Sequence, residues 1–209
     1  MAPIIEVSDE TLASLNRLGL DYTLKSQKNV SPNETSTIYV PSIGYDVARE
    51  RTGYGKNWYD SHNLQGNEVM LSPARWTEFL KHARDNDPEL FNSITEIRNS
   101  WRAEWIDAYF EQRNDDLYIL TENGTKAEKL DEDTLMEDGG ISLDSWLDNP
   151  TPQGLPRTDT TKGDLYYGHS KDGTVSRFSV DSLGAGFFCG GASSGRSSKL
   201  GVRAATKRE

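Results

Sequence analysis

Residues Val180–Arg203 read VDSLGAGFFCGGASSGRSSKLGVR, and they are the most informative part of this 209-residue chain. The eighteen residues from Asp181 to Ser198 contain no Lys, Glu, Gln, Trp or Met. Every residue type that they do contain can be encoded by a codon ending in a pyrimidine. This composition indicates side chains that change within a fixed codon frame, and the ordered ending Leu200-Gly201-Val202-Arg203 indicates a backbone that does not change.

Two parts of this stretch resemble a known family. The ending Leu200–Arg203 resembles the final core strand of the C-type lectin fold, in the branch shared with formylglycine-generating enzymes. The Ser/Gly-rich run around Cys189 resembles the variable region of target proteins of diversity-generating retroelements, most closely the archaeal and archaeal-virus members. In those proteins adenine-specific mutagenesis rewrites the ligand-binding face. The resemblance extends over residues 70–120 and, more closely, 164–203.

The resemblance implies an α+β fold of the C-type lectin-like class, with two main helices, short antiparallel strands and long irregular loops. It implies a single domain over residues 1–209, with a variable ligand-binding segment at about 179–199 that we call the window. The protein would be a display protein for varied ligands, which we expect to be proteins. The candidate ligand-binding residues are Ser179, Asp181, Ser182, Leu183, Gly186, Phe188, Gly190, Gly191, Ala192, Ser194, Gly195, Arg196, Ser197 and Ser198.

The residue types of the window suit recognition of a protein surface. Ser and Gly give adaptable hydrogen bonding, while Phe and Arg supply anchors of the kind that paratopes use. Because side chains alternate along a strand, we expect Phe187 to point into the core and Phe188 to point outward. Arg203 is expected to pair with the scaffold instead of a ligand. The rival interpretation is a Gly/Ser-rich surface loop without a binding role.

Composition limits the class of protein. A chain of 209 residues fits one domain with a sizeable core, and 5 Trp and 9 Tyr argue against disorder. No apolar run is long enough to span a bilayer, and residues 1–6 lack the pattern of a secretory signal. The single cysteine excludes an internal disulfide. We therefore expect a protein of the cytoplasm, or of a virion assembled there.

The net charge of −10 is concentrated in one segment. Residues 115–148 carry eleven Asp and Glu against Lys126 and Lys129. This segment is expected to be a solvated acidic surface that repels nucleic acid. The alternative is that this segment binds calcium, but Asp131-Glu132-Asp133 lacks the ligand spacing of an EF-hand loop.

Local patterns predict the elements along the chain. Ser72-Pro73 is a strong helix start, because Ser caps the helix and Pro is tolerated in its first turn. Apolar residues spaced by three and four predict helices over 73–86 and 88–112, with Asn99-Ser100 as a possible bend or break. The other expected elements are strands at 4–7, 37–40, 117–120, 164–169 and 174–180, helices at 12–18 and 143–147, and irregular segments at 29–37 and 51–67. The turn Lys171-Asp172-Gly173 predicts that the last two strands form a hairpin.

No motif predicts catalysis, a metal or a cofactor. His62, His82 and His169 lie far apart in the sequence, without a metal-ligand spacing. Formylglycine-generating enzymes work through a pair of cysteines, whereas Cys189 is alone and is expected to be buried. The Glu-Pro-Asn and Gln-Pro-Asp triplets of calcium-dependent sugar sites are absent. Two alternatives stay open: an enzyme related to the formylglycine-generating type or another oxidoreductase, and a ribbon-helix-helix DNA-binding module at residues 4–18.

Overall fold

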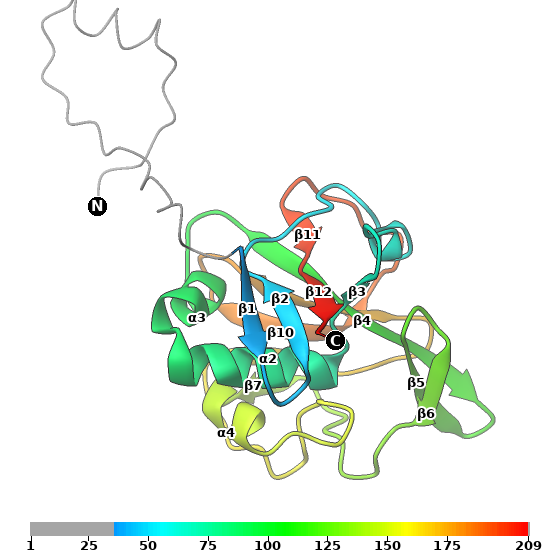
Figure 1. Cartoon of the computed structure of the whole chain (residues 1–209). Coiled ribbons are helices and arrows are strands. Elements are labelled where there is room, and N and C mark those ends of the chain that lie inside the picture. Colours follow the sequence, from blue (N-terminus) through cyan, green and yellow to red (C-terminus); the bar gives the residue numbers. More distant parts are fainter. Residues whose placement is uncertain (1–35, 209) are drawn as a thin grey trace, which may run out of the picture. The chain divides into compact units, whose positions relative to one another are not determined.

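Two β-sheets organise residues 36–208, which are the part of the chain that the structure, a computed structural model, describes (Figure 1). The smaller sheet is antiparallel and has the order β1-β2-β12-β3. Its strands are β1 (Thr37–Val40), β2 (Tyr45–Ala48), β12 (Ala204–Lys207) and β3 (Glu68–Met70). The strand at 37–40 is therefore confirmed, while the elements predicted at 4–7 and 12–18 lie outside the described residues.

The larger sheet has eight strands, and the order along its path is β6-β5-β4-β9-β10-β8-β7, with β11 paired to β4. Its strands are β4 (Arg102–Arg113), β5 (Asp116–Thr121), β6 (Lys126–Lys129), β7 (Gly139–Ile141), β8 (Leu165–Gly168), β9 (Val175–Val180), β10 (Ala185–Gly191) and β11 (Leu200–Val202). Most pairs are antiparallel, but β10 with β8 and β11 with β4 are parallel. The long strand β4 is central because it pairs with β5, β9 and β11.

Three α-helices within residues 36–208 gather on one side of the sheets, and a short 3-10 helix, η1 (Asp60–His62), lies elsewhere (Figure 1). The α-helices are α2 (Pro73–Asn86), α3 (Pro88–Thr95) and α4 (Leu143–Asp148). The Ser72 hydroxyl caps α2 by accepting a hydrogen bond from the Arg75 backbone N–H at 3.4 Å, as the sequence predicts. The helix predicted at 143–147 is also confirmed.

The helices cover one face of the larger sheet with aromatic side chains. Trp76 of α2 lies 5.8 Å from Phe178 of β9, measured between ring centroids. Trp146 of α4 stacks on Phe187 of β10 at 4.7 Å. All four rings are buried, so this face holds the main core.

The predicted helix over 88–112 is wrong beyond Thr95. Helix α3 ends there, Ile97 is 60% exposed, and the chain enters β4 at Arg102. The first part of β4 is buried on both faces, so its apolar residues do not alternate with polar ones. Without that alternation, the spacing of the apolar residues resembles that of an amphipathic helix. Pairing with three other strands, which is a tertiary contact, decides the conformation.

The predicted hairpin of residues 164–180 is also wrong. Both strands form, and Gly173 adopts the positive φ of a tight turn (+73°), but β10 lies between β8 and β9. Strand β11 is likewise not the final strand, because β12 follows it in the smaller sheet. The described chain is thus a mixed α+β structure in which sheets predominate. No helix among its described residues is both long and apolar enough to cross a membrane.

Candidate ligand-binding face

The middle of the window, residues 185–191, is the central strand β10. Strand β10 pairs with β9 on one side and with β8 on the other. Its backbone is therefore hydrogen-bonded along both edges, and only its side chains can differ without disturbing the sheet. Residues 192–199 then form an ordered connection to β11.

Side chains of β10 alternate between the two faces of the larger sheet. Phe187 is fully buried between Trp146 and Tyr167, and Cys189 is buried with it. Phe188 points to the opposite face, where it is half-buried, and Gly190 is exposed. The predicted inward Phe187 and outward Phe188 are confirmed.

The second half of the window is held by its backbone. The Trp58 N–H donates to the Ser193 carbonyl at 3.0 Å, and the Gly55 N–H donates to the Ser197 carbonyl at 3.0 Å. The Arg51 guanidinium donates to the Lys199 carbonyl at 2.9 Å. Residues 51–58 thus fix this connection through its carbonyl groups, without using its side chains.

A second, smaller core lies beneath this connection. It includes Trp58, Trp105, Val175 and Val202. The Trp58 indole N–H donates to the Ile106 carbonyl at 2.9 Å. A Cβ built on Gly195 would lie 3.7 Å from the Trp105 ring, so the connection packs directly on this core. This core covers only part of the sheet face opposite the helices.

The candidate residues divide by exposure. The exposed ones are Ser182, Leu183, Gly190, Ala192, Ser194, Arg196 and Ser198, and Leu183 is 93% exposed. Asp181, Phe188, Gly195 and Ser197 are half-buried. Arg196 forms a 2.6 Å ion pair with Asp60, and both side chains are largely in solvent, so the pair contributes little to stability.

Ser179, Gly186 and Gly191 are buried, which corrects the expectation that they present side chains to a ligand. Ser179 lies between Ala103 of β4 and Gly186 of β10 in the sheet register. A Cβ on Gly186 would lie 2.4 Å from the Phe188 ring, and one on Gly191 would lie 2.9 Å from the Val175 carbonyl oxygen. Close packing, which the sequence does not reveal, therefore opposes a larger residue at Gly191, where the nearest atom belongs to the backbone, and at Gly186 a larger residue would require the Phe188 ring to move.

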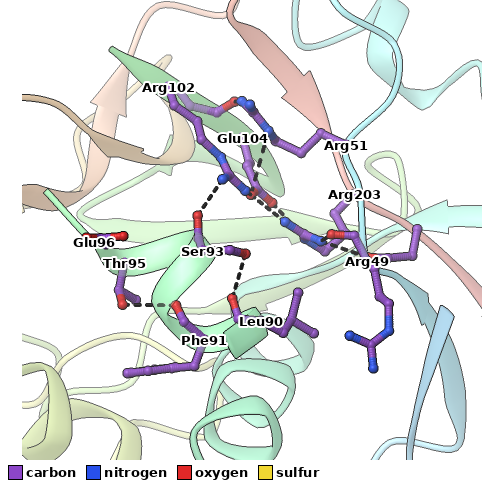
Figure 2. A network of polar contacts seen from close by, with 12 residues as sticks. Arg49, Arg51, Leu90, Phe91, Ser93, Thr95, Glu96, Arg102, Glu104 and Arg203 are labelled. Atoms are coloured by element: carbon purple, nitrogen blue, oxygen red, sulfur yellow. Dashed lines mark hydrogen bonds and ion pairs between the residues drawn. The ribbon is translucent and has the colours of Figure 1, made fainter. Parts of the chain in front are cut away.

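The chain that follows the window is anchored by a buried ion pair (Figure 2). Arg203 donates from Nε and Nη2 to both carboxylate oxygens of Glu104, at 3.0 and 2.8 Å. Arg51 and Arg102 lie within 4.0 and 3.4 Å of the same carboxylate. Burial alone would raise the pKa of Glu104, but the guanidinium groups, Arg203 foremost, hold it below its usual value. The expected structural role of Arg203 is confirmed.

A small pocket of about 170 Å³ opens beside the window, on the face opposite the helices. Its lining includes Phe188 and Gly190 of the window together with Tyr166, His169 and Arg177. The Arg177 guanidinium lies 5.2 Å above the Phe188 ring, and the Tyr166 ring lies 5.3 Å from it. Sequence reasoning missed Arg177, although it is the one charged residue in the apolar strand VSRFSV.

The other candidate residues are engaged within the protein or buried. The Nε2 atom of His62 lies 2.8 Å from Asp107 Oδ1, its Nδ1 lies 3.1 Å from the Trp58 carbonyl oxygen, and the residue lines a separate pocket of about 260 Å³. Burial raises the pKa of the Cys189 thiol to about 12, so it is protonated at neutral pH and cannot act as a thiolate nucleophile. Among residues 36–208, no three or more His, Cys, Asp and Glu side chains gather in a metal-binding arrangement.

No protein-family model, curated protein or solved structure matches the chain. Its function is therefore inferred from its own residues and their geometry.

Proposed function

We propose that this is a ligand-binding display protein with a C-type lectin-like fold, whose window is diversified by a retroelement to recognise varied protein targets. One observation carries the proposal: the backbone of the window is held by hydrogen bonds, while several of its side chains are exposed and make no contact with the described residues that fixes them. Ser182, Ser194 and Ser198 are exposed and make no side-chain hydrogen bond to residues 36–208. Exposed positions of this kind contribute little to stability and can be exchanged.

The surroundings of the window suit a protein ligand. Tyr54 lies in the segment that holds residues 192–199 and Tyr59 directly follows it; they are 46% and 54% exposed, and Tyr166 is 44% exposed beside Phe188. Tyrosines provide large contact area at low entropic cost, and they are enriched at binding hot spots. A set of fixed aromatic residues around exchangeable small ones supports a protein-binding surface without a catalytic role or a cofactor.

The proposal includes a location in the cytoplasm or in a virion assembled there. Cys189 is a free, buried thiol, which fits a reducing compartment. The acidic segment at 115–148 argues against a nucleic-acid partner, since like charges repel.

A display experiment tests the binding function. Leu183, Ala192, Ser194, Ser197 and Ser198 are randomised together with NNY codons, and the library is selected against a panel of folded proteins. We expect most members to fold and specific binders to be recovered. A control library randomised at the buried positions Phe187, Leu200 and Val202 should be largely unfolded. Equal loss of folding in both libraries would contradict a display surface.

The retroelement requires a separate test in the neighbouring DNA. We expect a reverse transcriptase gene and a near-copy of the sequence that encodes the window, differing from it at adenines. A genomic neighbourhood without either would leave a binding protein but exclude diversification.

A further inference from the structure

The guanidinium of Arg177 stands out among the arginines of residues 36–208. It is the only one with neither a hydrogen bond nor an ion pair, and its contact is with the face of the Phe188 ring. Its Nε is inaccessible to solvent and unpartnered. Partial burial lowers the pKa of Arg177, since no carboxylate compensates for the lost hydration. A desolvated cation without a counter-charge is unfavourable unless a ligand supplies one.

The same pocket holds a further unused donor. The side chain of Lys171 lines it, and the ammonium group makes no hydrogen bond or ion pair with the described residues. His169 uses Nδ1 to contact Asp138 Oδ1 at 2.6 Å, and its Nε2 has no partner among the described residues. Asp138 also accepts the His169 backbone N–H at 2.9 Å, so the only carboxylate in the pocket lining is already engaged. The two cationic side chains of the pocket without a partner, Arg177 and Lys171, are therefore both donors, in a protein whose net charge is −10.

The size and surroundings of the pocket define what it can hold. A volume of about 170 Å³ is below the ~300–1,000 Å³ of typical cofactor sites, so one side chain is a better fit than a whole cofactor. The exposed Asp172 follows Lys171, and Asp138 of the acidic segment lines the pocket, so a chain of phosphates would be repelled. Stacking on Phe188 covers the face of the guanidinium, but its edge can donate to two oxygens of a planar carboxylate.

We propose that this pocket binds the carboxylate of an Asp or Glu side chain on the target. The inference deepens the proposed function and rests on it in one respect, that the target is a protein. Arg177, His169 and Lys171 all lie outside the window, while Phe188 and Gly190 within it form part of the same lining. A constant anion site thus borders the exchangeable residues. Diversified variants would share a preference for acidic epitopes, and the exposed window positions would select among them.

The test uses the full chain labelled with ¹⁵N and the probe N-acetyl-glutamate amide. Its uncharged isostere, N-acetyl-glutamine amide, is the control probe. We expect the glutamate probe to shift the Arg177 Nε–H and His169 backbone N–H resonances in a saturable manner. The glutamine probe should leave both unchanged. Equal shifts with the two probes would refute recognition of a carboxylate.

Variants locate the site. Arg177→Gln is expected to weaken binding about tenfold or more, as the loss of a charge-assisted pair requires. Arg113→Gln, which removes an exposed arginine at the far end of β4, should not change binding. If Arg177→Gln does not fold, the exposed Lys171→Gln replaces it, with an expected weakening of severalfold. Equal affinities for wild type and a folded pocket variant would overturn the proposal.

Inorganic phosphate forms a third arm. Saturable binding of phosphate with no response to the glutamate probe would overturn the choice of an acidic side chain. The result of this titration can be distinguished from that of the display experiment. If the glutamate probe binds but the window tolerates no substitution, the protein has an anion site without a display function. If the window tolerates substitution but the glutamate probe does not bind, the protein has a display surface without the anion site.

Discussion

The two faces of the larger sheet differ in how completely they are covered. On one face Phe178 and Phe187 lie beneath the helices and are fully buried. On the other face, Trp105 is buried by the connection after β10, whereas Phe188 is left half-exposed beside an unpaired Arg177. In the sheet register Trp105 of β4 lies opposite Arg177 of β9, and Arg177 lies opposite Phe188 of β10. The side chains on this face are therefore buried at β4 and half-buried at β9 and β10.

This contrast indicates that the residues that stabilise the larger sheet are distinct from those whose side chains are exposed beside the window. The covered face and the small core around Trp105 fix the strands, and backbone hydrogen bonds fix the window. Substitutions in the exposed part of the second face are then expected to cost little stability. Four sets of variants test this separation, and they are ordered below from the largest expected effect to the smallest.

Glu104→Gln is expected to destabilise the protein most, by about 3–5 kcal/mol at pH 7, because it leaves buried arginines without their counter-charge. The pKa of Glu104 is lowered by folding, so its contribution is present above the unfolded value of about 4.3 and is lost as pH falls through the lower folded value. Urea denaturation should therefore show that the difference in stability between wild type and variant shrinks as the pH falls below about 4.3.

Glu111→Gln is the matched control for this change. Glu111 lies on the same strand and pairs with Arg113 in solvent, so its loss should alter the free energy of unfolding by at most about 1 kcal/mol. Similar losses for the two variants would mean that burial of the Glu104 pair is not what anchors the chain after the window.

Trp105→Ala should cost about 3–5 kcal/mol, since it empties the small core beneath residues 192–199. Phe188→Ala, on the same face, should cost about 1 kcal/mol because its ring is only partly buried. Denaturation midpoints compare the two directly. A Phe188 effect as large as that of Trp105 would place Phe188 in the core and remove it from the binding surface.

Two neighbouring glycines sharpen the comparison within one strand. Gly191→Ala is expected to cost about 1–3 kcal/mol, because its Cβ would lie 2.9 Å from the Val175 carbonyl oxygen. Gly190→Ala should change stability by less than about 0.5 kcal/mol, since its Cβ would meet only the His169 carbonyl oxygen at 3.5 Å and its φ is not positive. Thermal denaturation of both variants checks the difference, and equal losses would contradict it.

The smallest effect is expected from a multiple change in the window. Replacing Leu183, Ala192, Ser194 and Ser198 by Asn should alter the free energy of unfolding by no more than about 0.5 kcal/mol each, because all four side chains are exposed. Urea denaturation with Gly190 kept intact provides the measurement. A total loss above about 3 kcal/mol would show that the window belongs to the core.

Several features of the fold and site were predictable because their causes are local. Ser72-Pro73 starts α2, the sequence from Leu143 forms α4, and period-two alternation orients Phe187 and Phe188 correctly. The structural role of Arg203 also agreed with its place after an apolar strand. The composition of the window, with its small residues, correctly indicated exposure at Leu183 and Ala192.

Other features depend on contacts between distant residues, so no local pattern could reveal them. The residues of β4 have helical spacing, and only the neighbouring strands β5, β9 and β11 make them a strand. The insertion of β10 between β8 and β9 prevents the hairpin that the turn at Gly173 indicates. Likewise, Ser179, Gly186 and Gly191 are buried by atoms of other strands, and the pocket at Arg177 exists only where three strands meet.

The sequence by itself determined where helices α2 and α4 begin and to which face of the sheet Phe187 and Phe188 point. The composition of the window also indicated that many of its side chains are exposed. These properties follow from capping, strand geometry and composition, each of which acts over a few residues. The tertiary structure alone decided that β4 is a strand, that Gly191 cannot be enlarged, and that Arg177 lacks a partner. Pairing, close packing and desolvation depend on atoms brought together from distant parts of the chain.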